Sequence, residues 1–339
     1  MIAIIGNGLS GLSFAQLCQY KGWPYEIIAP TQPGSNSKKL LLNHQSLTLL
    51  KEICPDVTPD HIYDSLTINI KNKPCEINFS ASDYDLPGIA YAVSYNRLSE
   101  LFSKKITYTQ AHVHRLDYSQ QRPVLNMSNA SKKYQHVIAC DGARSTIRSQ
   151  LGIKQNKGAS GVSIIIPAHI NSKTLHIQFS QKVTGAILPG ENGQIILSGT
   201  SALRQFTPTL QELKQFFPEY IDLVSIGTPI YISYQRAITH SNYAHNCLLL
   251  GESALSIPPI AAQGFNHTLA QINHLAELDI LTPESIRKKS TYLAQMNQQL
   301  WQEMAIISNH PFLRNQFLNL AQHSQFLTRQ LFIFGNRYA

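Results

Sequence analysis

The stretch "IAIIGNGLSG", residues 2–11, decides the fold of this chain. Its apolar residues predict a short buried strand, and a G-x-G-x-x-G turn with Gly6, Gly8 and Gly11 follows directly. Residues 12–22 continue in helical rhythm, and "YEII" predicts a second strand. A glycine turn inside such a βαβ unit is typical of a dinucleotide site. We expect Gly6 to allow the tight turn, Gly8 to admit a pyrophosphate, and Gly11 to let helix and strand pack closely.

Two further features complete this expected site. Leu9 and Ser10 open the helix, whose first N–H groups and partial positive charge favour phosphate. An acidic residue normally ends the second strand and accepts hydrogen bonds from the ribose hydroxyls. Ala29 stands at that position, and Glu26 lies three residues too early to reach. The loss of such charged hydrogen bonds weakens binding by roughly 1.5–3 kcal/mol each.

Charge and composition limit the kinds of partner that this chain is expected to bind. The chain has 339 residues, of which 43% are hydrophobic and 14% charged, and its formal net charge is +8. The basic residues are scattered, whereas a nucleic-acid partner would need a concentrated basic patch with aromatic residues, so we expect none. Two explanations of the positive net charge remain, which are solubility and attraction to an anionic membrane surface. Lys38 and Lys39 either contact a cofactor phosphate or are solvated loop charges.

Other classes of protein are disfavoured by residue spacing. The five cysteines include no C-x-x-C pair and the thirteen histidines form no ligand cluster, so we expect neither a disulfide framework nor a metal site. This pattern fits a reducing cytoplasm. No apolar run approaches the roughly 20 residues of a membrane span, and the N-terminus does not resemble a signal peptide. No nucleophile elbow or Ser-His-Asp arrangement stands out.

The order of patterns along the chain predicts an α/β fold with two interleaved domains. A Rossmann-like domain is expected from discontinuous segments, and short β runs separated by Gly, Pro and Asn predict an inserted antiparallel sheet that lines the substrate pocket. A helical segment ends the chain. The expected segments are 1–65, 96–158 and 240–282 for the nucleotide-binding domain, 66–95 and 159–239 for the β-rich domain, and 283–339 for the helical end.

Two later motifs follow strand patterns. "CDGARSTIR", residues 140–148, contains D-G-x-x-S-x-x-R after the strand "HVIA". Asp141 and Gly142 predict a sharp strand exit, and Ser145 suits a helix start. "GESALSIPPIAAQGFNHTLA", residues 251–270, follows the apolar run "CLLL" and enters a predicted helix.

In this order and spacing, the three motifs resemble those of the group A flavoprotein aromatic hydroxylases, which have the p-hydroxybenzoate hydroxylase fold. The segments "PIAAQGFNHTLA", "GIAYAVSYNRLSELF" and "PFLRNQFLNLAQHSQFLTRQLFIFG" most resemble the ubiquinone-biosynthesis hydroxylases. The resemblance covers nearly the whole chain, although the chain is short for that family. It implies an FAD-dependent monooxygenase that uses NADH or NADPH and O₂ and hydroxylates a phenolic ring through a flavin C4a-hydroperoxide. The implied substrate is a ubiquinone precursor with a polyprenyl tail, and a soluble aromatic compound is the alternative.

The resemblance also assigns residues. It implies that Pro259 lines the active face of the flavin and that the turn at residues 263–266 directs backbone N–H groups toward the flavin ring. For Arg97, an exposed residue at a helix start is the competing explanation. The implied cofactor-binding residues are Gly6, Gly8, Leu9, Ser10, Gly11, Lys38, Arg97, Asp141, Gly251, Glu252, Gln263, Gly264, Phe265 and Asn266.

Several departures from the family pattern leave two interpretations open. Glu252 replaces an aspartate and adds a methylene, Ala262 replaces a glycine, and Gln271 replaces an aspartate. A methyl group at Ala262 crowds the ring if the backbone there requires a positive φ. Together with Ala29, these changes fit either a divergent working hydroxylase or a homologue that binds FAD weakly or not at all and acts as a scaffold in a ubiquinone-synthesis complex.

The C-terminal segment predicts one apolar helical face. Its members are Leu313, Phe317, Leu320, Leu327, Leu331 and Phe334. This face either packs on the flavin domain or an oligomer partner, or meets a membrane surface or a lipid-carrying protein, because a polyprenylated substrate is insoluble in water. The expected location is cytoplasmic, with peripheral contact at the inner membrane face.

Overall fold

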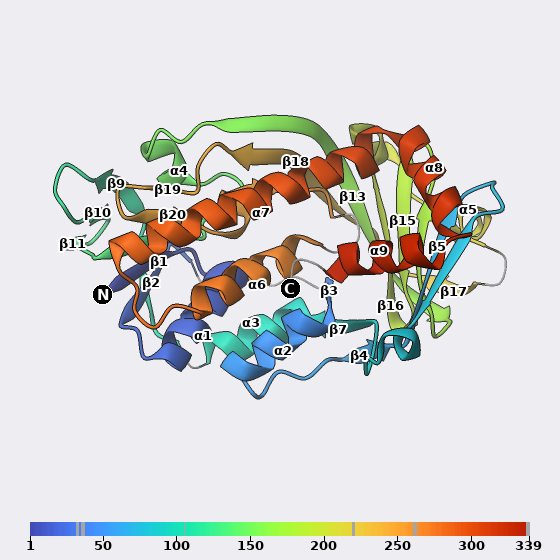
Figure 1. Cartoon of the computed structure of the whole chain (residues 1–339), viewed down its shortest axis with the longest axis horizontal. Coiled ribbons are helices and arrows are strands. Elements are labelled where there is room, and N and C mark those ends of the chain that lie inside the picture. Colours follow the sequence, from blue (N-terminus) through green and yellow to red (C-terminus); the bar gives the residue numbers. More distant parts are fainter. Residues whose placement is uncertain (32–33, 35–37, 105, 219–220, 260–262, 337–339) are drawn as a thin grey trace.

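In the computed structural model, the parallel sheet lies at one end of the molecule and a large antiparallel sheet at the other (Figure 1). The long helix α7 (Pro283–Asn309) runs between the two ends. The structure describes residues 1–31, 34, 38–104, 106–218, 221–259 and 263–336. This arrangement is the predicted fold class.

The first sheet has the strand order β19-β20-β12-β1-β2-β8 and is parallel except at its β19 edge. Continuous apolar runs form its central strands, because helices cover one face and a small sheet with α4 covers the other. The strands are β1 (Ile2–Ile5), β2 (Tyr25–Ala29), β8 (Tyr108–Gln110), β12 (His136–Ala139), β19 (Tyr243–Ala244) and β20 (Cys247–Leu249). The helices are α1 (Leu9–Lys21), α2 (His44–Ile53), α3 (Tyr95–Ser103), α4 (Thr146–Gln150) and α6 (Gln263–Ala276).

The second sheet has the order β21-β18-β13-β16-β15-β14-β5-β6, and β17 also pairs with β13. Its pairs are antiparallel except for β14 with β5. The short helix α5 (Leu210–Phe216) covers one face. The strands are β5 (Ser65–Ile70), β6 (Glu76–Ser80), β13 (Gln155–Asn171), β14 (Leu175–Phe179), β15 (Val183–Leu188), β16 (Gly190–Gly199), β17 (Asp222–Ile226), β18 (Ile230–Thr239) and β21 (Leu255–Ser256).

The described residues also form two small sheets and three 3₁₀ turns. The strand β7 belongs to the segment 66–95 that was expected in the β-rich domain, but it pairs with β3 and β4 beside the nucleotide-binding part. The small sheets are β3 (Lys39–Leu42), β7 (Ala90–Ser94) and β4 (His61–Tyr63), and β9 (Val113–Asp117), β10 (Val124–Met127) and β11 (Ser131–Lys133). The turns are η1 (Ala81–Tyr84), η2 (Ser201–Gln205) and η3 (Gly251–Ser253).

The C-terminal segment is helical, as expected, but it does not present one apolar face. After α7 the chain forms two helices, α8 (Pro311–Ala321) and α9 (Gln325–Asn336), so the face expected from the periodicity is divided between them. Leu313 and Leu320 are exposed, whereas Leu327 and Leu331 pack against the core formed with β5 and β6. The side chain of Phe334 lies outside the described residues. None of the described helices is long and apolar enough to cross a membrane.

Candidate functional site

The glycine turn of the first motif adopts the expected geometry. Gly6 has φ +104°, and a Cβ there would lie 2.5 Å from the carbonyl oxygen of Cys140. A Cβ on Gly11 would lie 2.1 Å from the carbonyl oxygen of Gly6. Nothing lies within 4 Å of the position a Cβ would take on Gly8. Gly6 and Gly11 therefore permit close backbone packing, whereas Gly8 leaves open space for a ligand.

Glu26 does not replace the missing acidic residue at the end of β2. Its carboxylate accepts hydrogen bonds from Thr109 Oγ1 at 2.6 Å, Lys132 Nζ at 2.6 Å and Tyr134 Oη at 2.8 Å. Burial opposes ionisation of Glu26, but the bonds from Lys132, Thr109 and Tyr134 outweigh it and lower its pKa. Ala29 ends the strand and is 1% exposed. The Glu26 carboxylate is thus bound to these three side chains and not directed to the end of the strand, in line with the expectation that it does not reach the cofactor.

Asp141 of the second motif organises the start of α4. Its Oδ2 accepts from the backbone N–H of Thr146 at 2.8 Å and of Ile147 at 3.2 Å. Its Oδ1 is buried and has no hydrogen-bond partner among the described residues. A buried acceptor without a donor is costly, so a ligand hydroxyl or an ordered water that donates to Oδ1 would stabilise the site.

The third motif lies against the first. Gly251 has φ +66°, and a Cβ there would lie 2.7 Å from Ser10 Oγ. Glu252 lines the adjoining cavity together with Lys38 and Tyr95, and Lys38 Nζ lies 5.2 Å from the centre of the Tyr95 ring. Burial lowers the pKa of Lys38, and the Glu252 carboxylate partly opposes this. The longer Glu252 side chain thus acts electrostatically on Lys38, beside the expected pyrophosphate position.

The first turn of α6 contacts the neighbouring strand β3 and also lines the cavity. Asn266 Nδ2 donates to the Leu41 carbonyl oxygen at 2.9 Å, and Asn266 Oδ1 accepts from the Asn43 N–H at 3.1 Å. A Cβ on Gly264 would meet nothing within 4 Å. The first turn of α6 therefore borders open space, and the side chain of Asn266 anchors it. Ala262, whose methyl group would crowd the ring if the backbone there required a positive φ, lies outside the described residues.

One cavity of about 1490 Å³ brings most of the expected residues together. It begins at the glycine turn, passes the start of α6 and continues over the large sheet to the C-terminal helices. The expected residues that line it are Gly8, Leu9, Ser10, Lys38, Glu252, Pro259, Gln263, Gly264, Phe265 and Asn266. Gly6, Gly11, Asp141 and Gly251 lie behind these and shape the backbone that carries them.

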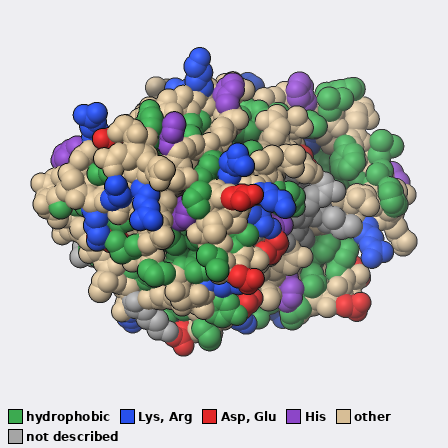
Figure 2. Space-filling model, turned by 60° about the vertical axis from the view of Figure 1, so that its left-hand side comes forward, with side chains coloured by type: hydrophobic (Ala, Val, Ile, Leu, Met, Phe, Trp, Pro, Cys, Tyr) green, Lys and Arg blue, Asp and Glu red, His purple; other side chains and the backbone are tan. Residues whose placement is uncertain are grey.

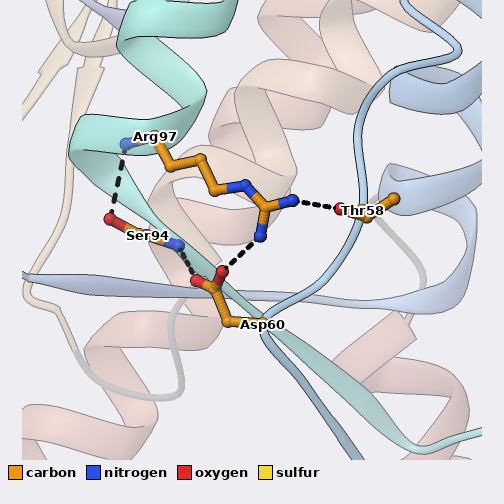
Figure 3. Close-up of polar contacts among 4 residues, drawn as sticks. All are labelled: Thr58, Asp60, Ser94 and Arg97. Atoms are coloured by element: carbon orange, nitrogen blue, oxygen red, sulfur yellow. Dashed lines mark hydrogen bonds and ion pairs between the residues drawn. The ribbon is translucent and has the colours of Figure 1, made fainter.

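Arg97 is placed differently from the other expected residues. Its guanidinium forms an ion pair with Asp60 Oδ1 at 2.7 Å and donates to Thr58 Oγ1, while Asp60 Oδ2 accepts from the Ser94 N–H (Figure 3). The side chain of Arg97 is 52% exposed and does not line the cavity. These contacts tie the start of α3 to the loop before β4 and give no support to a flavin contact.

The sequence alone did not identify the residues that line the far end of the cavity. It is apolar and is built from strands of the large sheet and from the C-terminal helices, which are distant in sequence. Its apolar lining residues include Leu66, Ile68, Phe79, Leu175, Ile177, Phe179, Leu318, Leu331 and Phe332. Arg314 also lines it and donates to the carbonyl oxygens of Ser180 at 2.9 Å and Ile307 at 3.3 Å.

Comparison with known proteins decides the family. The FAD binding domain family matches residues 108–278, which include the second and third motifs and half of the chain. This chain belongs to that family. The family supports FAD as the cofactor, and the open positions at Gly8 and Gly264, which both line the cavity, fit such a group. When bound, FAD would lie along Gly8, Ser10 and Glu252.

Solved structures show the same fold. p-Nitrophenol 4-monooxygenase from Pseudomonas putida DLL-E4 is 12% identical, with a TM-score of 0.78 over 99% of this chain and 97% of that one. 2,6-Dihydroxypyridine-3-hydroxylase from Arthrobacter nicotinovorans is 16% identical, with a TM-score of 0.68 over 90% and 91%. The Diels-Alderase PyrE3 of the pyrroindomycin pathway is 13% identical, with a TM-score of 0.67 over 98% and 79%. The expected FAD-binding family is confirmed, and the expected fold is the one that these solved structures share.

The structure also shows how charged side chains and possible metal-binding side chains are distributed. On the face in Figure 2, Lys and Arg side chains are distributed among polar and apolar ones and form no continuous basic surface. Among the described residues, no group of three or more His, Cys, Asp or Glu side chains could hold a metal ion.

Proposed function

We propose that this protein is an FAD-dependent monooxygenase that hydroxylates a phenolic ring, and that its substrate is a polyprenylated ubiquinone precursor. The continuity of one cavity from the glycine turn to the C-terminal helices carries the proposal. Its volume of about 1490 Å³ exceeds the roughly 300–1,000 Å³ of ordinary ligand pockets. A dinucleotide and an aromatic substrate with an apolar extension can therefore occupy it together.

The residues of the cavity would bind and orient the reactants. FAD, with NADH or NADPH as electron donor, supplies the oxygen-activating redox chemistry when bound. The first N–H groups of α6, at Gln263 and Gly264, carry partial positive charge and would stabilise negative charge on a flavin ring bound in this part of the cavity. Pro259 forms part of the wall beside them. The apolar lining beyond excludes water from the reacting ring.

The apolar tail of the substrate would lie under the C-terminal helices. Ile306 and Phe317 line the cavity and are also 50% and 41% exposed, so the cavity meets the surface there. Further exposed apolar side chains near this opening in sequence are Phe312, Leu313, Leu320 and Phe326. Such side chains suit a lipid surface or a lipid-carrying protein. We therefore propose a peripheral position at the cytoplasmic face of the inner membrane.

Two alternatives use the same site differently. A soluble aromatic compound would occupy only the part of the cavity nearest α6. A catalytically inactive scaffold in a ubiquinone-synthesis complex would keep the fold without using the cofactor, and Ala29 and Glu252 support this alternative. The Diels-Alderase among the similar structures illustrates that this fold also occurs in a protein named for a different reaction.

The flavin content of the purified protein distinguishes the proposed enzyme from the inactive scaffold. We expect the purified protein to be yellow, or added FAD to raise its melting temperature. A colourless protein whose melting temperature FAD leaves unchanged would refute both enzyme proposals. Substrate-stimulated oxidation of NADH or NADPH then separates the two enzymes. We expect phenols with a prenyl tail to stimulate it at lower concentration than the matching phenols without one.

A further inference from the structure

A buried polar network lies directly behind the third motif. We name it the Gln271–Asn297 network, and it consists of His267 and Gln271 on α6, Asn297 on α7, Thr239 at the end of β18 and Asn242 just after that strand. Gln271, Asn297 and Asn242 are at most 1% exposed. None of the five residues lines the large cavity. They join the helix that begins at the site to the helix of the C-terminal segment.

The hydrogen bonds of the network have one consistent direction. Asn297 Oδ1 accepts from Gln271 Nε2 at 2.7 Å and from His267 Nε2 at 2.6 Å, which requires the Nε2–H tautomer of His267. Asn297 Nδ2 donates to Asn242 Oδ1 at 3.2 Å, and the same oxygen accepts from Thr239 Oγ1 at 3.0 Å. The backbone N–H of Gly251 can only donate, so Gln271 presents Oε1 to Gly251 and Nε2 to Asn297, and this sets the orientation of both amides.

The direction of these hydrogen bonds determines which atom of the Gln271 amide faces Gly251. With its Nε2 directed to Asn297, its Oε1 accepts from the backbone N–H of Gly251 at 3.1 Å. Gly251 adopts a positive φ and lies against Ser10 and Thr268, so this peptide has little room to shift. The next residue, Glu252, lines the cavity.

We propose that Gln271 and Asn297 are positioning residues for the cofactor, and that α7 thereby controls how tightly FAD binds. Gln271 holds the peptide at Gly251, and Asn297 holds the orientation of Gln271. The proposal rests on FAD binding in this cavity. It gives the replacement of the family aspartate by Gln271 a physical reason, because a neutral amide both accepts from Gly251 and donates to Asn297, whereas an ionised carboxylate cannot donate.

The test compares FAD affinity with stability in a double-mutant cycle. Gln271→Met and Asn297→Leu remove the side-chain hydrogen bonds at similar volume, and Asn297→Ser is a milder substitute if Asn297→Leu does not fold. Leu293→Ala is the matched control, because Leu293 is buried on the same helix and lies outside the network. FAD dissociation constants come from titration of the apoprotein, and melting temperatures from the same samples without FAD.

We expect Gln271→Met and Asn297→Leu each to weaken FAD binding about tenfold, as the loss of one well-oriented hydrogen bond would. The double variant should be no weaker than Gln271→Met alone, because Asn297 acts through Gln271. Leu293→Ala should lower the melting temperature and leave the dissociation constant unchanged. Wild-type affinity in Asn297→Leu, an additive loss of roughly 100-fold in the double variant, or an equal loss in Leu293→Ala would overturn the proposal. A wild-type protein without FAD affinity would overturn the proposed function as well.

Discussion

Arg148 donates a hydrogen bond from Nη1 to the carbonyl oxygen of Ser253 at 2.9 Å and thereby joins the second motif to the third. Its Nη2 donates to the carbonyl oxygen of Ala143 at 2.9 Å, and the side chain is buried. Two segments that are more than 100 residues apart in sequence are thus held in one wall of the cavity. The spacing of each motif alone does not reveal this contact.

Replacing Arg148 with Met should destabilise the protein by about 2–4 kcal/mol and weaken FAD binding, because the carbonyl oxygens of buried Ser253 and of Ala143 lose their charged donor. Urea unfolding and FAD titration measure the two effects. Arg115→Met, at an exposed arginine on β9, serves as the control and should change neither. An Arg148→Met protein with wild-type FAD affinity would show that this contact serves stability alone.

Introducing Glu at Ala29 should restore the acidic residue that normally ends the second strand. Because Ala29 is 1% exposed, we expect the apoprotein to lose stability while FAD binding tightens about tenfold through new ribose hydrogen bonds. Ala29→Gln is a neutral control of the same length. Calorimetric FAD titration of the three proteins provides the comparison, and equal affinities would contradict the assignment of Ala29 to the ribose position.

Mutation of Arg97 should leave the cofactor site unaffected. Its ion pair with Asp60 is half exposed, so Arg97→Met should cost no more than about 1 kcal/mol of the free energy of unfolding. Asp60→Asn should give a loss of similar size, and both variants should bind FAD as the wild type does. A clear weakening of FAD binding in Arg97→Met, with none in Asp60→Asn, would return Arg97 to the cofactor site.

Acid should destabilise the fold through two buried histidines. Burial lowers the pKa of His267 to about 4, opposed by its bond to Asn297, and lowers that of His176 to about 4, opposed by Glu76. The unfolded chain protonates these rings near pH 6.5 while the folded chain does not, so stability is full above pH 6.5 and falls toward pH 4. Each histidine should contribute a slope of roughly 1 kcal/mol per pH unit. Urea unfolding between these pH values should show a smaller slope for His176→Gln than for the wild type.

The opening at Phe317 should distinguish long substrates from short ones. Phe317→Asp places a charge where the proposed tail leaves the cavity, so we expect KM for a prenylated phenol to rise at least tenfold, with little change for the unprenylated phenol. Phe326→Asp, at an exposed residue that does not line the cavity, is the matched control. Equal effects of Phe317→Asp on both phenols would favour the soluble aromatic substrate.

Sequence reasoning identified the parts of the site that local backbone geometry dictates. The strand and glycine turn at residues 2–11, the D-G exit at Asp141 and the helix start at Gln263 each depend on a few neighbouring residues. The position of Glu26 on the strand, before its end, likewise indicated that its carboxylate does not reach the expected ribose position. These features are predictable because turns and helix starts are determined within one or two turns of chain.

The sequence by itself therefore determined the parallel nucleotide-binding sheet, the antiparallel insertion, the helical end and the order of the three motifs. Only the tertiary structure decided that Arg97 pairs with Asp60, that the C-terminal face divides between α8 and α9, and that Asn297 reaches Gly251 through Gln271. Each of these contacts joins segments far apart in the chain, or depends on where a helix is interrupted. Periodicity reports which face of an element is buried, but the partner on that face is selected by packing and hydrogen-bond geometry in the folded molecule.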